Sequence, residues 1–171
     1  MNMTQRPYTL AVVIAFALIG TVVTPALEKP NSVLAFERLT SLVGEWKGAQ
    51  DGREMKLTYT LTARGSALME EFRAGKTVMV TMFTVDGDHL VATHYCSAGN
   101  QPQMMTKAIT DPSDKSLTFS LSHVYGMKTP GDWHNTGLTV TMEDGQHLSQ
   151  VWTYEHDGKM GMNTFHFTRE R

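Results

Sequence analysis

His94, Tyr95 and Cys96 follow one another in a segment with the composition of a β-strand. Because side chains alternate faces along a strand, His94 and Cys96 should point the same way, ~7 Å apart. Such a pair could anchor the polar end of a ligand in an otherwise apolar cavity, or act as a thiol–imidazole nucleophile. A buried, hydrogen-bonded histidine beside a small apolar cysteine would give the same pattern. All three interpretations stay open on these residues alone.

A predicted turn and a methionine-bearing strand follow this segment. Asn100 and Gln101 lie in the turn, where asparagine is favoured by local backbone hydrogen bonding, and Met104 begins the return strand. His134 lies in a long connection from His123 to Asn135, where a flap over the barrel could sit. A solvated loop histidine is the alternative interpretation of His134. The predicted ligand-binding residues are His94, Tyr95, Cys96, Asn100, Gln101, Met104, His134 and Trp152.

Histidine and methionine are frequent in this chain, with seven and twelve residues. Imidazole and thioether groups are soft ligands for copper, and histidine can also ligate haem. No histidine pair has the helical spacing of a tight metal site, and His89 and His94 lie on opposite faces of a strand. Met160 and Met162 share one face, but flexible methionines commonly fill an adaptable core. A haem or soft-metal site is therefore a secondary hypothesis, and no metal ligand is assigned.

Motifs for common enzymatic chemistry are absent from the sequence. It contains no Gly-x-Ser-x-Gly elbow and no phosphate-binding loop. Glu70 and Glu71 are adjacent, so they face opposite sides of a strand and do not form an acid–base pair. An unknown reaction using His94 and Cys96 is the remaining catalytic alternative. With a net charge of −2 and no basic cluster, the chain is not expected to bind nucleic acid.

The first 26 residues have the composition of a secretory signal peptide. Arg6 is their only charged side chain, and an apolar stretch over residues 10–23 precedes a small-residue site at Ala26. The stretch is shorter than the ~20 residues of a membrane span, so an uncleaved anchor is the alternative. We expect cleavage after Ala26, with Ala35 as a second candidate site. Export to the periplasm or the medium follows, with no stable membrane span after cleavage.

Residues 27–44 are predicted to form a lead-in with one short helix. Val33, Phe36 and Leu39 recur there at helical spacing. After this helix, residues 45–171 are predicted to form a single β-domain. The only cysteine cannot make an intrachain disulfide, so core burial has to stabilise this domain.

Nine turn-forming clusters divide residues 45–171 into ten strand-like runs. Most clusters contain Asp-Gly, Asn or Pro, which favour the backbone angles of tight turns. Short turns join antiparallel neighbours, and a single sheet of ten strands is too large to stay open without curling. Closure also removes exposed strand edges. The sequence therefore predicts an all-β fold, an up-and-down antiparallel barrel of about ten strands, with a two-sheet sandwich as the alternative.

Residues at the two ends of this domain resemble the calycin pattern of lipocalins and fatty-acid-binding proteins. Gly44-Glu-Trp46 opens the first strand, and Arg169 lies near the end of the last. In calycins a Gly-x-Trp motif packs under an Arg or Lys from the final strand. The resemblance implies that Arg169 covers Trp46 and closes the barrel, a contact worth ~1 kcal/mol.

A longer central stretch is similar to a family of small bacterial proteins that are often exported and largely uncharacterised. The shared residues include Thr93-His-Tyr-Cys96 and Gly99-Asn-Gln-Pro102, followed by Met104, and the likeness extends to Trp46 and His134. It implies a lipocalin-like or nitrobindin-like barrel with no settled activity. Nitrobindin-type barrels bind haem through a histidine, but that ligand aligns with no position here.

Together these features predict an exported barrel that binds a small apolar or amphipathic molecule in its interior. Such barrels can enclose one small ligand. An enzyme that uses His94 and Cys96, and a haem or soft-metal binder, are the alternatives.

Overall fold

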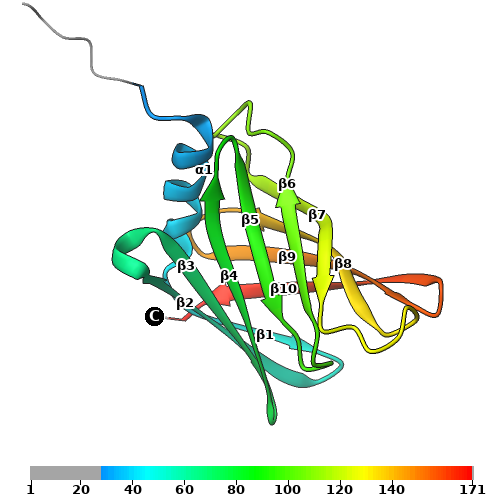
Figure 1. Cartoon of the computed structure of the whole chain (residues 1–171). Helices are drawn as coiled ribbons and strands as arrows, with labels where there is room; N and C mark the ends of the chain where they lie inside the picture. Colours follow the sequence, from blue (N-terminus) through cyan, green and yellow to red (C-terminus); the bar gives the residue numbers. More distant parts are fainter. Residues whose placement is uncertain (1–27, 171) are drawn as a thin grey trace, which may run out of the picture.

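Each predicted strand-like run forms a strand in the computed structural model, which describes residues 28–170 (Figure 1). Neighbours in the chain are neighbours in the sheet, and the last strand pairs with the first to close the ring. The predicted ten-stranded antiparallel barrel is therefore confirmed. The strands are β1 (Gly44–Gln50), β2 (Arg53–Thr62), β3 (Ala67–Ala74), β4 (Thr77–Asp86), β5 (His89–Tyr95), β6 (Gln101–Thr106), β7 (Ser116–Tyr125), β8 (His134–Met142), β9 (His147–His156) and β10 (Lys159–Arg169).

The predicted signal peptide, residues 1–26, lies outside the described residues. Within residues 28–170, no helix is both long enough and apolar enough to cross a membrane.

A short helix, α1 (Asn31–Leu39), continues into a 3-10 turn, Thr40–Leu42, and lies against the end of the barrel where β4 joins β5. Its buried face includes Phe36 and Leu39, which join the barrel core. Asn31 Nδ2 donates a hydrogen bond to the Thr110 carbonyl at 3.0 Å, and Ser32 Oγ donates to the Gly87 carbonyl at 2.7 Å. These bonds fix the helix over the loops of this end, which we call the closed end.

The closed end is filled by apolar side chains around Trp46, which is fully buried. The indole Nε1 donates to the Leu42 carbonyl at 2.8 Å, so its only polar atom has a partner. The guanidinium carbon of Arg169 lies 4.1 Å from the centroid of the Trp46 ring. The same guanidinium donates hydrogen bonds to the backbone carbonyls of Ser41, Val43 and Gly145. One side chain from β10 thus ties the segment between α1 and β1 to the turn between β8 and β9, over the buried indole.

The seam between β1 and β10 is one of the two shortest strand pairings in the ring, together with that of β5 and β6. It has three residue pairs, Trp46–Arg169, Lys47–Thr168 and Gly48–Phe167, whereas β9 and β10 pair over ten. Gly48 allows the two backbones to approach, because a Cβ atom at this position would lie 2.4 Å from the His166 carbonyl oxygen.

Candidate functional site

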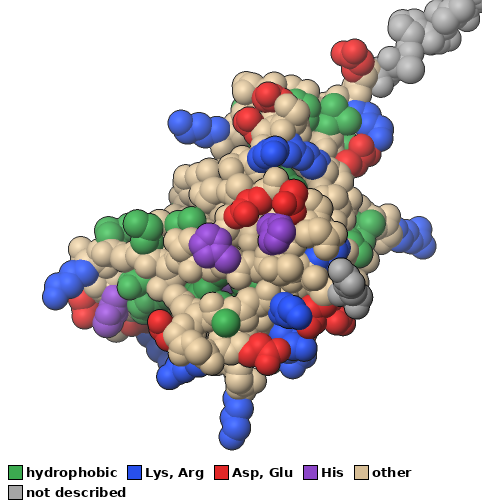
Figure 2. Space-filling model, turned by 180° about the vertical axis from the view of Figure 1, so that it is seen from behind, with side chains coloured by type: hydrophobic (Ala, Val, Ile, Leu, Met, Phe, Trp, Pro, Cys, Tyr) green, Lys and Arg blue, Asp and Glu red, His purple; other side chains and the backbone are tan. Residues whose placement is uncertain are grey.

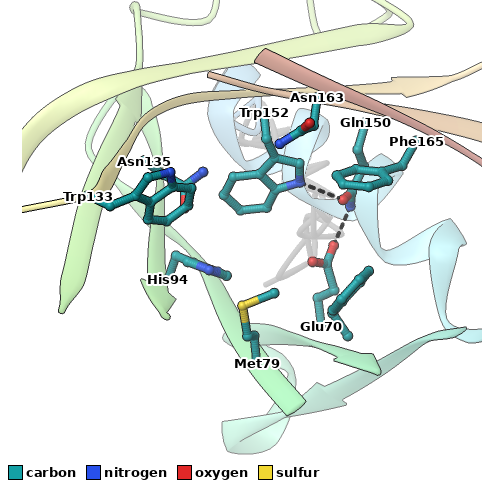
Figure 3. A pocket seen from close by; sticks show the side chains of 10 residues that line it. Glu70, Met79, His94, Trp133, Asn135, Gln150, Trp152, Asn163 and Phe165 are labelled. Atoms are coloured by element: carbon teal, nitrogen blue, oxygen red, sulfur yellow. Dashed lines mark hydrogen bonds between the residues drawn. The ribbon is translucent and has the colours of Figure 1, made fainter. Parts of the chain in front are cut away.

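A cavity of about 120 Å³ lies inside the barrel, at the end of β5 that is farther from α1 (Figure 3). Typical ligand pockets measure ~300–1,000 Å³, but an apolar cavity of ~150 Å³ is enough to hold one benzene-sized molecule. The site therefore has the size of a single small ring or a short chain. Its walls are formed by Glu70 and Phe72 of β3, Met79 of β4, His94 of β5, Trp133 and Asn135 at the start of β8, Gln150 and Trp152 of β9, and Asn163 and Phe165 of β10.

Glu70 is buried in the wall of this cavity because it lies on the inward face of β3, between Leu68 and Phe72. Its Oε2 atom accepts hydrogen bonds from the Tyr59 hydroxyl and, at 2.5 Å, from Gln150 Nε2. Gln150 Oε1 in turn accepts a hydrogen bond from Trp152 Nε1 at 2.9 Å (Figure 3). Three side chains from β2 and β9 thus hold the carboxyl group in one orientation.

Burial raises the pKa of the Glu70 carboxyl to about 7, and the hydrogen bonds from Tyr59, Gln150 and Thr81 oppose this rise. No Lys or Arg side chain lines the described cavity to offset a negative charge. Burial next to Glu70 also raises the pKa of the Tyr59 hydroxyl well above its usual range. In mildly acid solution, therefore, both groups carry a proton.

His94 faces the same cavity from β5, with its imidazole 4.7 Å from the Trp152 ring, centroid to centroid. Its Nδ1 atom lies 2.9 Å from Thr81 Oγ1, and Thr81 Oγ1 lies 3.5 Å from Glu70 Oε1. Burial lowers the pKa of the His94 imidazole to about 4. Between pH 4 and pH 7, Glu70 and His94 are therefore both mainly neutral, and the cavity has polar walls without a net charge.

A β-bulge at Thr136 determines which side chain β8 presents to the cavity. Gly137 pairs with Thr153 of β9, but Asn135 pairs with Tyr154, so Thr136 is the extra residue. Such an insertion reverses the alternation of faces beyond it. Asn135 consequently lines the cavity, whereas His134 is buried outside the lining and its Nδ1 lies 2.8 Å from the Asp132 carbonyl oxygen.

Two of the predicted ligand-binding residues, His94 and Trp152, line the cavity and contact each other. Tyr95 faces outward and is half exposed. Cys96 lies beyond the end of β5, where its Sγ accepts a hydrogen bond from the Ala98 amide at 3.4 Å. Met104 is fully buried in the core rather than in the cavity wall.

Of the other two predicted residues at this mouth, Asn100 supports the cavity wall from behind and Gln101 does not. Asn100 Nδ2 donates to the Trp133 carbonyl at 2.7 Å, which fixes the backbone that carries the Trp133 ring. Trp133 also stacks on Tyr154, with ring centroids 5.3 Å apart. Gln101 Nε2 donates to the Gly99 carbonyl at 3.2 Å within its own turn.

Four polar residues of the cavity wall were not predicted as site residues from the sequence: Glu70, Asn135, Gln150 and Asn163. The detectable pattern for Glu70 was its alternation with two apolar residues, Leu68 and Phe72, on one face of a strand. For Asn135 the sequence contains no comparable pattern, because its orientation depends on the bulge one residue later.

The described residues contain no group of three or more His, Cys, Asp or Glu side chains that could hold a metal ion. They also contain no hydrogen bond between His94 and Cys96. The Nδ1 atom of His94 is directed to Thr81 instead.

Comparisons with known proteins support the fold. No family model matches this chain, and no curated protein matches it. A crystal structure of a protein of unknown function from the DUF3598 family of Nostoc punctiforme PCC 73102 is similar, with a TM-score of 0.51 and 13% sequence identity. The alignment covers 77% of this chain and 49% of that one, so this chain spans about half the length of its structural neighbour. At this identity the likeness shows the fold alone.

Proposed function

We propose that this protein is an exported binding barrel that holds a small, uncharged molecule in the cavity beside Glu70 and His94. The observation that carries the proposal is an interior cavity with aromatic walls. Five hydrogen-bonding side chains converge on it: Glu70, His94, Asn135, Gln150 and Asn163. Ligand sites are typically apolar with a few such convergent polar groups.

The walls favour a neutral ligand over an anion. The described lining contains no Lys or Arg that could neutralise a carboxylate or phosphate, and its one acidic group is itself held near neutrality by burial. A volume of about 120 Å³ matches one ring with a polar substituent, which agrees with the small amphipathic ligand expected from the sequence. A porphyrin would not fit without moving the walls, so the cavity does not favour haem.

Export is the part of the proposal that rests on residues 1–26, with their single charge, apolar centre and small-residue site.

The binding proposal is tested by filling the cavity. Asn163 faces the cavity from β10, and its neighbour Thr164 faces solvent. Binding of phenol, cyclohexanol and cyclopentanone is measured by ¹H–¹⁵N NMR through the indole signal of Trp152. Because so small a ligand has few contacts, dissociation constants between micromolar and millimolar are expected.

The Asn163→Phe variant should lose this binding, whereas the matched Thr164→Phe variant should retain it, because its added ring lies outside the barrel. Equal binding to both variants, or no perturbation of Trp152 in the wild-type protein by any of the three compounds, contradicts the proposal.

A further inference from the structure

Glu70, Thr81 and His94 form an unbranched chain of hydrogen-bonding groups that ends in the cavity. Glu70 Oε2 already accepts two donors, so a proton on this carboxyl belongs on Oε1, the oxygen that faces Thr81 at 3.5 Å. Thr81 Oγ1 is 2.9 Å from His94 Nδ1. Within the described residues Nδ1 has this single partner, and the imidazole of His94 forms part of the cavity wall. The Nε2 atom is therefore left for a ligand.

The threonine hydroxyl has one proton, so it can donate to only one of its two neighbours at a time. When Glu70 is neutral, Oε1–H donates to Thr81, Thr81 donates to His94 Nδ1, and the imidazole proton is on Nε2. When Glu70 is ionised, Thr81 donates to Oε1, His94 Nδ1–H donates to Thr81, and Nε2 has a lone pair. The direction of the chain thus fixes the tautomer of His94.

We propose that ionisation of Glu70 switches His94 Nε2 from a hydrogen-bond donor to a hydrogen-bond acceptor, so that one cavity selects two classes of neutral ligand. The proton-bearing form of Nε2 suits a ring with a carbonyl or ether oxygen. The lone-pair form suits a ring with an N–H or O–H group. This inference rests on the proposed function, and it specifies the ligand class of that site.

The proton balance of the switch is complete. The Oε1 proton passes to Thr81 Oγ1, the hydroxyl proton passes to His94 Nδ1, and the Nε2 proton leaves through the cavity. One proton is released to solvent, and the imidazole is neutral before and after. The Glu70 carboxyl is buried and cannot exchange its proton with water directly. The hydrogen-bonded groups Thr81 and His94 connect it to water at the cavity mouth.

Among the groups around this site, Glu70 is the one that changes its charge between pH 5.5 and pH 8.5. Tyr59 of β2 keeps its proton, since its pKa is raised well above its usual range, mainly by burial and then by the charge of Glu70. His94 of β5 does not become cationic above pH 5, because burial lowers its pKa to about 4. The residues that face Glu70 from β4, β9 and β10 are uncharged: Met79, Thr81, Gln150, Trp152, Asn163 and Phe165.

Nitrogen NMR of His94 tests the switch without any ligand, because the two neutral tautomers have distinct ¹⁵N shifts. We expect Nε2–H at pH 5.5 and Nδ1–H at pH 8.5, with a midpoint near the Glu70 pKa of about 7, followed in parallel through its carboxyl ¹³C signal. The Glu70→Gln variant should keep Nε2–H at all pH values, since an amide N–H replaces the carboxyl O–H. The Thr81→Val variant should uncouple the tautomer from the carboxyl.

A single His94 tautomer across this pH range, a Glu70 carboxyl that does not titrate within it, or a pH-dependent tautomer in Glu70→Gln would overturn the switch.

A second experiment measures the binding of two five-membered rings, cyclopentanone as hydrogen-bond acceptor and pyrrole as hydrogen-bond donor. Cyclopentanone should bind about tenfold more tightly at pH 5.5 than at pH 8.5, and pyrrole should show the reverse. If the tautomer switches but neither compound binds, the proposed binding function fails while the switch stands. If both bind without a tautomer change, the switch fails alone.

Discussion

The two ends of this barrel bury tryptophan in opposite ways. At the closed end, Trp46 lies among apolar side chains under the Arg169 guanidinium, and its indole N–H has a backbone partner. At the cavity end, Trp152 contacts the neutral imidazole of His94 and donates to Gln150, which in turn holds a buried carboxyl. The first arrangement fills space, and the second surrounds a cavity with aromatic rings and a few polar groups. The comparison shows that close apolar packing is concentrated at one end of the barrel and the cavity lies at the other.

The largest expected effect is on the closed end. Replacing Trp46 by Ala removes a fully buried ring and leaves a cavity in the core, so the free energy of unfolding should fall by ~3–5 kcal/mol. Urea denaturation followed by circular dichroism measures the loss. The Trp152→Ala substitution only enlarges an existing cavity, so it should lower the free energy of unfolding less. An equal loss in both variants would contradict the contrast between the two ends.

The next effect concerns Glu70 and depends on pH. Its pKa rises from 4.5 in the unfolded chain to about 7 in the folded protein, mainly through burial. The folded state therefore binds more protons than the unfolded state in this window, so stability is complete below pH 4.5 and is lost as pH rises through 7. This loss amounts to about 3 kcal/mol. The Glu70→Gln variant avoids it and should exceed the wild type in unfolding free energy at pH 8.5 but not at pH 4.

The contribution of His94 to the free energy of unfolding depends on pH in the opposite direction. Burial lowers its pKa from 6.5 to about 4, so its contribution is complete above pH 6.5 and is lost as pH falls toward 4. In the wild type the two dependences oppose each other between pH 4.5 and 6.5. We therefore expect a nearly flat stability profile there, which tilts upward with pH in Glu70→Gln and downward in His94→Gln. Denaturant titrations at five pH values measure these slopes. Profiles of equal slope in the two variants would show that Glu70 and His94 do not have opposite effects on stability.

The smallest effect is at the seam. Arg169→Ala removes the cation over Trp46 and three hydrogen bonds to backbone carbonyls, and should lower the free energy of unfolding by ~1 kcal/mol. Arg53→Ala, at an exposed position on β2, is the control, and thermal denaturation measures both. A loss no greater than that of the control would show that Arg169 has no part in closing the barrel.

The fold was predictable because the residues that specify its hairpins are close together in the chain. Clusters such as Asp51-Gly52 and Asp157-Gly158 mark the hairpins, and short hairpins leave little freedom in strand order. The site was predictable only in part. Of the residues that line the cavity, His94 and Trp152 were named from the sequence, because imidazole and indole side chains are notable on any strand.

Glu70 and Asn135 were missed for different physical reasons. A glutamate beside another glutamate suggests a solvated strand face, and only the partners supplied by Tyr59 and Gln150 make its burial tolerable. Tyr59 lies on the preceding strand, but Gln150 comes from β9, 80 residues away in the chain. Asn135 faces inward because of the bulge at Thr136, a change of register that alternation alone cannot reveal.

The short seam between β1 and β10 also bears on how the chain reaches this state. Nine of the ten strand pairings join consecutive strands and can form as local hairpins, but the tenth joins the first strand to the last. Such a distant pairing forms late, because loop-closure entropy opposes it. During synthesis β1 has no second partner until β10 has emerged from the ribosome. A polypeptide with this topology therefore cannot close its barrel until its final strand has been made.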